Sequence, residues 1–165
     1  MIAPSPAPRI RAATLDDLDA RTWHGIAKLR QDVFVVEQDC PYPDLDERDG
    51  EPGSLHLWLP GPAAGEGGPG PVLATLRLLS ERDGSGAETR RIGRVATAVE
   101  HRGQGLMAAL LSDALDRCAG LPVVIEAQSY LRAWYEGFGF AVTGPEFLED
   151  GIPHLPMLRA AAPTP

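Results

Sequence analysis

The sequence predicts an α/β fold with a mixed central sheet, and two patterns support this prediction. After an N-terminal helix-like segment, three strand-like runs follow one another with only turns between them, which is typical of an antiparallel meander. Helix-like and strand-like segments then alternate, so the later strands need crossover connections. A chain of 165 residues fits a single domain. We expect this domain to span residues 10–159, between flexible tails at 1–9 and 160–165.

The composition narrows the class of protein. A net charge of −8 argues against an extended nucleic-acid backbone as a partner. No window approaches the run of about 18 apolar residues that a membrane span needs, and the N-terminus lacks the apolar core of a signal peptide. Cys40 and Cys118 match no metal-ligand spacing, so free thiols in a reducing compartment are expected. We therefore expect a cytoplasmic protein with no metal and no membrane partner.

The N-terminal part is predicted to contain one helix and one acidic loop. Thr22 is expected to cap the helix, which runs to about Phe34 and presents one apolar face. The turn-rich segment 40–53, here called the acidic loop, carries five carboxylates whose spacing does not fit an EF-hand. It is expected to be solvated, and the alternative is a wall that attracts an amine substrate. The five carboxylates are Asp44, Asp46, Glu47, Asp49 and Glu51.

Three strands form the expected meander. They are predicted at Ser54–Leu59, Val72–Ser80 and residues 89–99. The Gly- and Pro-rich segment 60–71 is expected to be a flexible surface loop between the first two strands. Arg77 interrupts the apolar pattern of the second strand, so its side chain is expected to face solvent or a site.

Helices and strands alternate in the second half of the chain. Leu106 to Cys118 has an apolar stripe at helical spacing. A buried strand is predicted at Leu121–Ala127 and a short helix at Leu131–Phe138. Two last strands are expected at Phe140–Gly144 and about Leu155–Arg159, joined by a polar loop.

A glycine-rich turn between a strand and a helix is the strongest candidate site. Arg102, Gly103, Gln104 and Gly105 make up this turn, here called the glycine loop, and the helix starts at Leu106. Glycine lets the backbone approach a ligand closely, and the first N–H groups of a helix have no internal partners. These groups also lie at the positive end of the helix dipole. The glycine loop therefore predicts an anion site, most often for phosphate.

The same glycines also fit the GxGxxA fingerprint of dinucleotide-binding folds. Gly103, Gly105 and Ala108 occupy its three positions, and Glu126 lies about 20 residues on, where a ribose-binding acid is expected. Length argues against this alternative, because only about 60 residues follow Gly105 and that fold needs repeated βαβ units there. A three-stranded meander ahead of the fingerprint is also wrong for a dinucleotide fold.

Two segments resemble signatures of the GCN5-related N-acetyltransferases. Residues 102–107 are similar to the family's R/Q-x-x-G-x-G/A motif and depart from it at the last position, where Met107 replaces Gly or Ala. The sequence WYEGFGF, residues 134–140, looks like the Tyr-x-x-x-Gly-Phe ending of the family's last helix. The resemblance extends over about residues 23–157 and points to the ElaA-like branch.

This resemblance implies an N-acetyltransferase that uses acetyl-CoA as a cosubstrate. In the family the strand before the glycine loop splays away from its parallel neighbour, and these strands would be Ile92–Val99 and Val123–Ala127 here. The pantetheine arm would pair with the freed strand, and the glycine loop would hold the pyrophosphate. Tyr135 would be the general acid that protonates the departing thiolate. The implied cofactor-binding residues are Val95, Ala96, Thr97, Arg102, Gly103, Gln104, Gly105, Leu106, Met107 and Tyr135.

The implied reaction is direct attack of a primary amine on the acetyl thioester in a ternary complex. A general base must take a proton from the amine. The candidates for this base are Glu37 beside Gln38, Glu126, His154 and a water molecule. Glu149 and Asp150 either bind the amine or cap a loop. The acceptor, a small molecule or a peptide, stays open, as does a homodimer. The alternative from another functional class is a non-catalytic acyl-CoA-binding or regulatory module.

Overall fold

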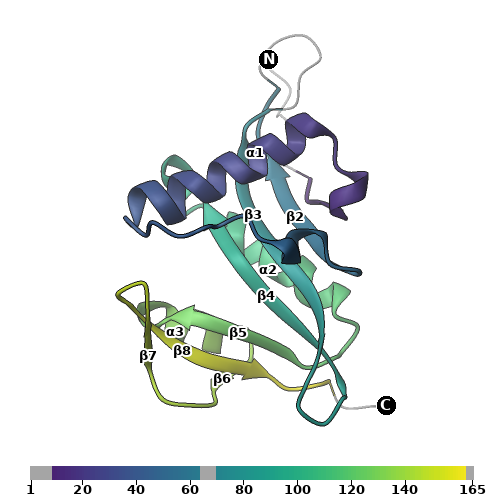
Figure 1. The fold of residues 1–165 in the computed structure, drawn as a ribbon, viewed down its shortest axis with the longest axis vertical. Helices are drawn as coiled ribbons and strands as arrows, with labels where there is room; N and C mark the ends of the chain where they lie inside the picture. The colour runs from purple at the N-terminus through teal and green to yellow at the C-terminus, as the bar shows by residue number, and fades with distance from the viewer. Residues whose placement is uncertain (1–8, 64–69, 163–165) are drawn as a thin grey trace, which may run out of the picture.

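One mixed sheet organises the molecule (Figure 1). The computed structural model describes residues 9–63 and 70–162. Within them, the sheet has eight strands in the order β1-β2-β3-β4-β5-β8-β6, and β7 pairs with β8 outside this path. The strands are β1 (Arg11–Ala13), β2 (Leu55–Pro60), β3 (Val72–Arg82), β4 (Glu88–Thr97), β5 (Val123–Gln128), β6 (Phe140–Val142), β7 (Phe147–Glu149) and β8 (Ile152–Arg159).

Helices cover both faces of this sheet (Figure 1). None of the described helices is long and apolar enough to cross a membrane. The α-helices are α1 (Ala20–Arg30), α2 (Leu106–Arg117) and α3 (Arg132–Glu136). A π-helix, η2 (Gln31–Glu37), continues α1. The 3-10 turns are η1 (Leu15–Asp17), η3 (Glu47–Gly50), η4 (Val99–His101) and η5 (Ser129–Leu131).

The predicted α/β fold with a mixed sheet is confirmed. Strands β2, β3 and β4 form the expected antiparallel meander, and β4 pairs with β5 in parallel. Two three-residue strands, β1 and β7, were not predicted, because so short a run carries no usable periodicity. The predicted tails at 1–9 and 160–165 and the predicted loop at 60–71 fall partly outside the described residues.

The start and the end of the first helix differ from the prediction. Asp19, not Thr22, is the cap: its Oδ1 accepts hydrogen bonds from the N–H groups of Arg21 and Thr22, each at 3.0 Å. An ionised carboxylate makes a stronger cap bond than a hydroxyl does, and the Thr22 hydroxyl itself donates to Asp19 Oδ2 at 2.6 Å. The helical segment also runs past Phe34, because η2 extends it to Glu37.

The two long helices bury different residues of the same strands. Neighbouring side chains of a strand point to opposite faces of the sheet. Trp58 and Val72 therefore pack with the α1 residue Ile26, whereas Leu57 and Leu59 pack with the α2 residues listed next. The buried residues of α2 are Leu110, Leu111, Ala114 and Leu115. Helices α1 and α2 thus lie on opposite faces, as Figure 1 shows.

Strand β4 bends away from β5 soon after the two strands meet. The register between β3 and β4 shifts between Thr75 and Arg77, which marks a β-bulge in β4. Arg94 lies in this bulge and has a left-handed backbone conformation with φ of +53°. Strand β4 pairs with β5 only at Arg90 and Arg91, and the strands then diverge (Figure 1). The predicted splay is therefore confirmed.

The acidic loop is solvated only in part, because two of its five carboxylates are buried against α1 and β3. Asp44 and Asp49 are 6% and 3% exposed. Arg30, 1% exposed, places Nε 2.8 Å from Asp44 Oδ2 and Nη1 2.7 Å from Asp49 Oδ1. Arg77 lines a cleft rather than facing solvent, and its Nη1 lies 2.5 Å from Asp46 Oδ1 and 2.8 Å from Asp49 Oδ1. The expectation of a solvated loop is wrong for Asp44 and Asp49.

Three arginines and three aspartates form one interconnected set, here called the Arg–Asp network. Arg94 completes it, with Nε 2.9 Å from Asp44 Oδ1. Burial alone would raise the pKa of Asp49, but hydrogen bonds from Arg30 and Arg77 lower it below its ordinary value. The network consists of Arg30, Arg77, Arg94, Asp44, Asp46 and Asp49.

Replacing Asp49 with alanine leaves the buried Arg30 and Arg77 undercompensated. We expect Asp49→Ala to lower the free energy of unfolding at pH 7 by about 3–5 kcal/mol in urea titrations. The control is Glu51→Ala, which breaks a pair with the half-exposed Arg48 and should cost less than about 1 kcal/mol. Because the pKa of Asp49 is lowered, its stabilisation is present above an unfolded value of about 3.9 and is lost below it. Equal losses of unfolding free energy in the two variants at pH 7 would show that the Arg–Asp network stabilises the fold no more than an exposed ion pair does.

Candidate active site

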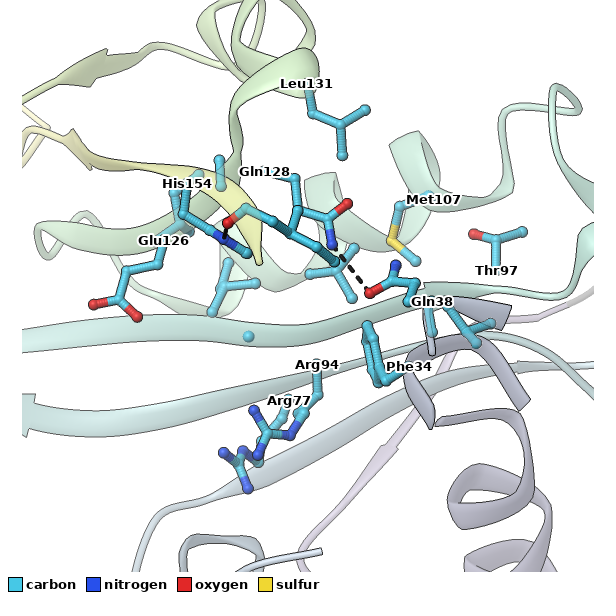
Figure 2. Close-up of a pocket in the computed structure, with 18 of the residues that line it drawn as sticks. Phe34, Gln38, Arg77, Arg94, Thr97, Met107, Glu126, Gln128, Leu131 and His154 are labelled. Carbon is cyan, nitrogen blue, oxygen red and sulfur yellow. Dashed lines mark hydrogen bonds between the residues drawn. The ribbon is translucent and has the colours of Figure 1, made fainter. Parts of the chain in front are cut away.

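A cleft of about 1010 Å³ opens where β4 and β5 diverge. Figure 2 shows side chains from both strands, from η2 and from α2 converging on it. Every predicted site residue except Gln104 lines this cleft. These residues are Glu37, Val95, Ala96, Thr97, Arg102, Gly103, Gly105, Leu106, Met107, Glu126, Tyr135 and His154.

The edge of β4 that faces the cleft has no strand partner. The parallel pairing with β5 stops at Arg91, and no other described strand pairs with this edge. Val95 and Thr97 are half-buried there, and Ala96 between them is buried. Backbone N–H and C=O groups of an unpaired edge are available to a ligand that lies alongside them.

The glycine loop presents a row of unused backbone donors. Gly103 and Gly105 have φ of +72° and +75°, and α2 begins directly after them without a side-chain cap. In the described part of the chain, no acceptor binds the N–H groups of residues 103–108. A Cβ atom on either glycine would meet nothing within 4 Å, so the space above the loop is open. The loop can therefore bind an anion through backbone groups alone.

Met107 leaves these donors in place but occupies part of the cleft. It lies in the first turn of α2 with an ordinary helical backbone, so its N–H group still points out of the helix end. Its half-buried side chain reaches into the cleft on the same side as Thr97 (Figure 2).

Arg102 is bound by Glu37 across the mouth of the cleft. Its Nη1 and Nη2 donate to the two carboxylate oxygens, each at 2.7 Å, and its Nε donates to the Thr97 carbonyl at 3.1 Å. The hydrogen bond from Arg102 lowers the pKa of Glu37 below its ordinary value. Glu37 is therefore ionised at neutral pH, with both of its oxygens engaged.

Tyr135 is a buried phenol at the cleft wall. It is 4% exposed and is packed edge-on against Trp134 at 4.8 Å and Phe140 at 5.8 Å between ring centroids. Burial, and to a lesser degree Tyr130, raises the pKa of Tyr135 to about 12. The phenol therefore keeps its proton at neutral pH, and Tyr135 is one of the residues that line the cleft.

His154 is held in one tautomer. Its ring is 8% exposed and is stacked on Phe147, with 5.8 Å between the ring centroids. Nδ1 lies 2.8 Å from the carbonyl oxygen of Ile152. Because a carbonyl oxygen can only accept, Nδ1 carries a hydrogen, and Nε2 is the ring nitrogen that this carbonyl does not contact. Nε2 is 3.8 Å from Glu149 Oε2.

The other carboxylates of the cleft are less constrained. Glu126 is half-exposed and lies 3.6 Å from Arg91, so it both lines the cleft and forms a surface pair. Glu149 and Asp150 border the cleft beside His154. The described residues contain no group of three or more His, Cys, Asp or Glu side chains arranged to hold a metal ion.

Several lining residues were not identified from the sequence. Gln128 Nε2 donates to Gln38 Oε1 at 3.2 Å and so joins the end of β5 to the end of η2 (Figure 2). Arg94 lies over the ring of Tyr42, 5.6 Å from its centroid. These contacts join positions 90 and 52 residues apart, so no local pattern could have revealed them.

Comparisons with known proteins show the family of this chain. Residues 81–160 match the family model described as an acetyltransferase (GNAT) domain. A UPF0039 protein of Mycobacterium tuberculosis is 48% identical over 150 residues, which cover 91% of this chain and 92% of that protein. Protein ElaA of Escherichia coli is 34% identical over 149 residues, which cover 87% of this chain and 90% of ElaA.

Solved structures show the same fold. An acyl-CoA N-acyltransferase from Pseudomonas aeruginosa has a TM-score of 0.79 at 35% identity, with 93% of this chain and 100% of that chain covered. The crystal structure of E. coli ElaA has a TM-score of 0.79 at 30% identity, with 92% of this chain and 99% of the ElaA chain covered. Sequence and structure therefore agree that this chain belongs to the GNAT acetyltransferase family, with the ElaA and UPF0039 proteins among its relatives.

Proposed function

We propose that the protein transfers the acetyl group of acetyl-CoA to a primary amine, by direct attack in a ternary complex. Family membership supports acyl-CoA-dependent acyl transfer, and the acetyl group and the amine are what is proposed beyond it. The observation that supports the proposal is a convergence within one cleft. An anion-binding loop, an unpaired strand edge and a buried phenol all border the same space.

Each part of the cosubstrate has a matching part of the cleft. The pyrophosphate would lie against the N–H groups of the glycine loop and the start of α2, beside Met107. The pantetheine arm would pair with the free edge of β4 at residues 95–97. A backbone N–H group of this edge would also stabilise the oxyanion that forms when the thioester is attacked.

The chemistry requires two proton transfers. The amine nitrogen attacks the acetyl carbon, the carbon–sulfur bond breaks, and the departing thiolate takes a proton. Tyr135, which lines the cleft, supplies this proton from its hydroxyl. A pKa of about 12 makes Tyr135 a weaker acid than a free phenol, so it gives up its proton only when the sulfur has become strongly negative.

We assign the general base to His154, acting directly or through a water molecule. Its Nδ1 is held by the Ile152 carbonyl, so Nε2, which lies beside Glu149 in the cleft wall, is the nitrogen that would accept the proton. Glu37 is a poor base, because both of its oxygens accept from Arg102 and its pKa is lowered. Glu126 is the competing candidate, since it lines the cleft and is only loosely paired with Arg91.

The acceptor amine would enter beside Glu149 and Asp150. Among the described residues, neither carboxylate is bound by an arginine or a lysine, so both can attract an ammonium group. This arrangement suits a small amine or the terminus of a peptide equally well. Cys40 and Cys118 are free thiols, which favours a reducing, cytoplasmic setting for the reaction.

Titration calorimetry with acetyl-CoA, followed by thiol release with a panel of amines, tests the proposal. The wild type should bind acetyl-CoA and release CoA with at least one amine. Gly105→Val should abolish binding, because its side chain would project into the open space above the loop. Gly86→Val is the matched control, since Gly86 also has positive φ and open surroundings but lies outside the cleft. Binding without CoA release from any amine would instead indicate a non-catalytic module.

Tyr135→Phe should lower kcat by about 10²-fold while the Kd for acetyl-CoA stays the same. Phenylalanine retains the edge-on contacts with Trp134 and Phe140, so the fold should be unaffected. Because only the protonated phenol is active and its pKa is about 12, wild-type kcat should not fall between pH 8 and about 10. A decline centred near pH 9 that Tyr135→Phe removes would show that this pKa is wrong.

His154→Gln and Glu126→Gln should separate the two candidate bases. We expect His154→Gln to lower kcat by about 10²-fold at pH 7, whereas Glu126→Gln should change it by less than about threefold. Both glutamines are polar and similar in size to the residues they replace, so the KM for acetyl-CoA should change little. The reverse order of effects would assign the base to Glu126.

A further inference from the structure

All three nitrogens of the Arg102 guanidinium group bind residues outside the glycine loop. Its Nη1 and Nη2 bind the Glu37 carboxylate, and its Nε binds the Thr97 carbonyl at the end of β4. All three guanidinium nitrogens therefore contact η2, through Glu37, or the end of β4, through Thr97. The open space above the loop is lined instead by backbone N–H groups.

The partner of Arg102 is positioned by an unusual helix. After Arg30 the chain leaves α-helical geometry and forms the seven-residue π-helix η2, which ends at Glu37. Segments of π-helix are rare and are frequent at functional sites, because they shift side chains relative to a regular helix. Two residues later, Asp39 has φ of +54°, so the chain turns sharply away once Glu37 has reached the loop.

The residue after Glu37 makes the matching contact on the other side of the cleft. Gln38 accepts a hydrogen bond from Gln128 at the end of β5 (Figure 2). The end of η2 therefore contacts both diverging strands, β4 through Arg102 and β5 through Gln128. Such a bridge limits how far the glycine loop can move relative to the strand edge.

We infer that Glu37 is a positioning residue: it holds Arg102, and through Arg102 it fixes the glycine loop in the conformation that binds pyrophosphate. This inference rests on the proposed acyl-CoA site. A loop that binds through backbone N–H groups has a higher affinity when it is ordered before the ligand arrives, because it loses less conformational entropy on binding. Arg102 acts here as a brace between β4 and η2, and the phosphate is bound by the backbone.

A double-mutant cycle on ligand affinity tests this role. The variants are Glu37→Gln, Arg102→Gln and the double variant, and the probes are CoA and pantetheine, which lacks the pyrophosphate. Each single substitution should weaken CoA binding about 5- to 10-fold, and the double variant should be no weaker than the worse single one. Pantetheine binding should stay within about twofold of wild type. The control Asp113→Asn breaks a similarly exposed pair with Arg117 in α2 and should leave both affinities unchanged.

Other outcomes overturn the inference in distinguishable ways. If Arg102 bound the phosphate itself, Arg102→Gln would weaken CoA binding whereas Glu37→Gln would leave it unchanged or tighten it, since a negative charge near the anion is removed. Equal losses for CoA and pantetheine would mean that the substitutions loosen the whole cleft. A wild-type protein that binds CoA no more tightly than its Glu37→Gln and Arg102→Gln variants would remove the inference alone. A wild-type protein that does not bind CoA would remove the proposed function as well.

Discussion

The divergence of β4 from β5 depends on the ion pairs that hold Arg94. This residue has a left-handed backbone conformation, which costs about 1 kcal/mol or more for a side chain of its size. Its guanidinium group binds Asp44 and Asp46, and the same Asp44 binds Arg30 at the end of α1. One buried aspartate thus connects the bulge in β4 to the point where α1 becomes a π-helix. The bulge opens the cleft and the π-helix brings Glu37 to its mouth, so both features rest on the same buried charges.

The two ends of the cleft have opposite polarity. At one end, the N–H groups of the glycine loop and of the first turn of α2 provide partial positive charge without any lysine. At the other end, the arginines that border the cleft are already paired with carboxylates, whereas no arginine in the described part of the chain is paired with Glu149 or Asp150. In Figure 2, Met107 and Thr97 lie toward the first end and Glu126 and His154 toward the second. A reaction between an anionic cosubstrate and a cationic amine fits this arrangement.

Features with a local cause could be predicted from the sequence, whereas features that depend on distant partners could not. The meander and the glycine loop follow from strand periodicity and from glycine in a turn, and they were predicted correctly. The acidic loop was misjudged because the arginines that bury Asp44 and Asp49 lie 14 to 28 residues away in the sequence. Glu37 shows the same limit: a carboxylate at the end of an apolar run looks like a base until its partner, 65 residues later, is known.

Met107 separates two requirements of the family motif, a backbone N–H group and space for the ligand. The last position of the glycine-loop motif, residue 107, contributes a backbone N–H group, and any residue with helical geometry supplies it. A small side chain at this position only leaves room. Met107 therefore preserves the anion-binding chemistry and reduces the space beside Thr97, where its flexible, unbranched side chain can adjust to a ligand. A departure from the motif at this position changes the shape of the cleft and keeps the backbone N–H group that the proposed pyrophosphate site needs.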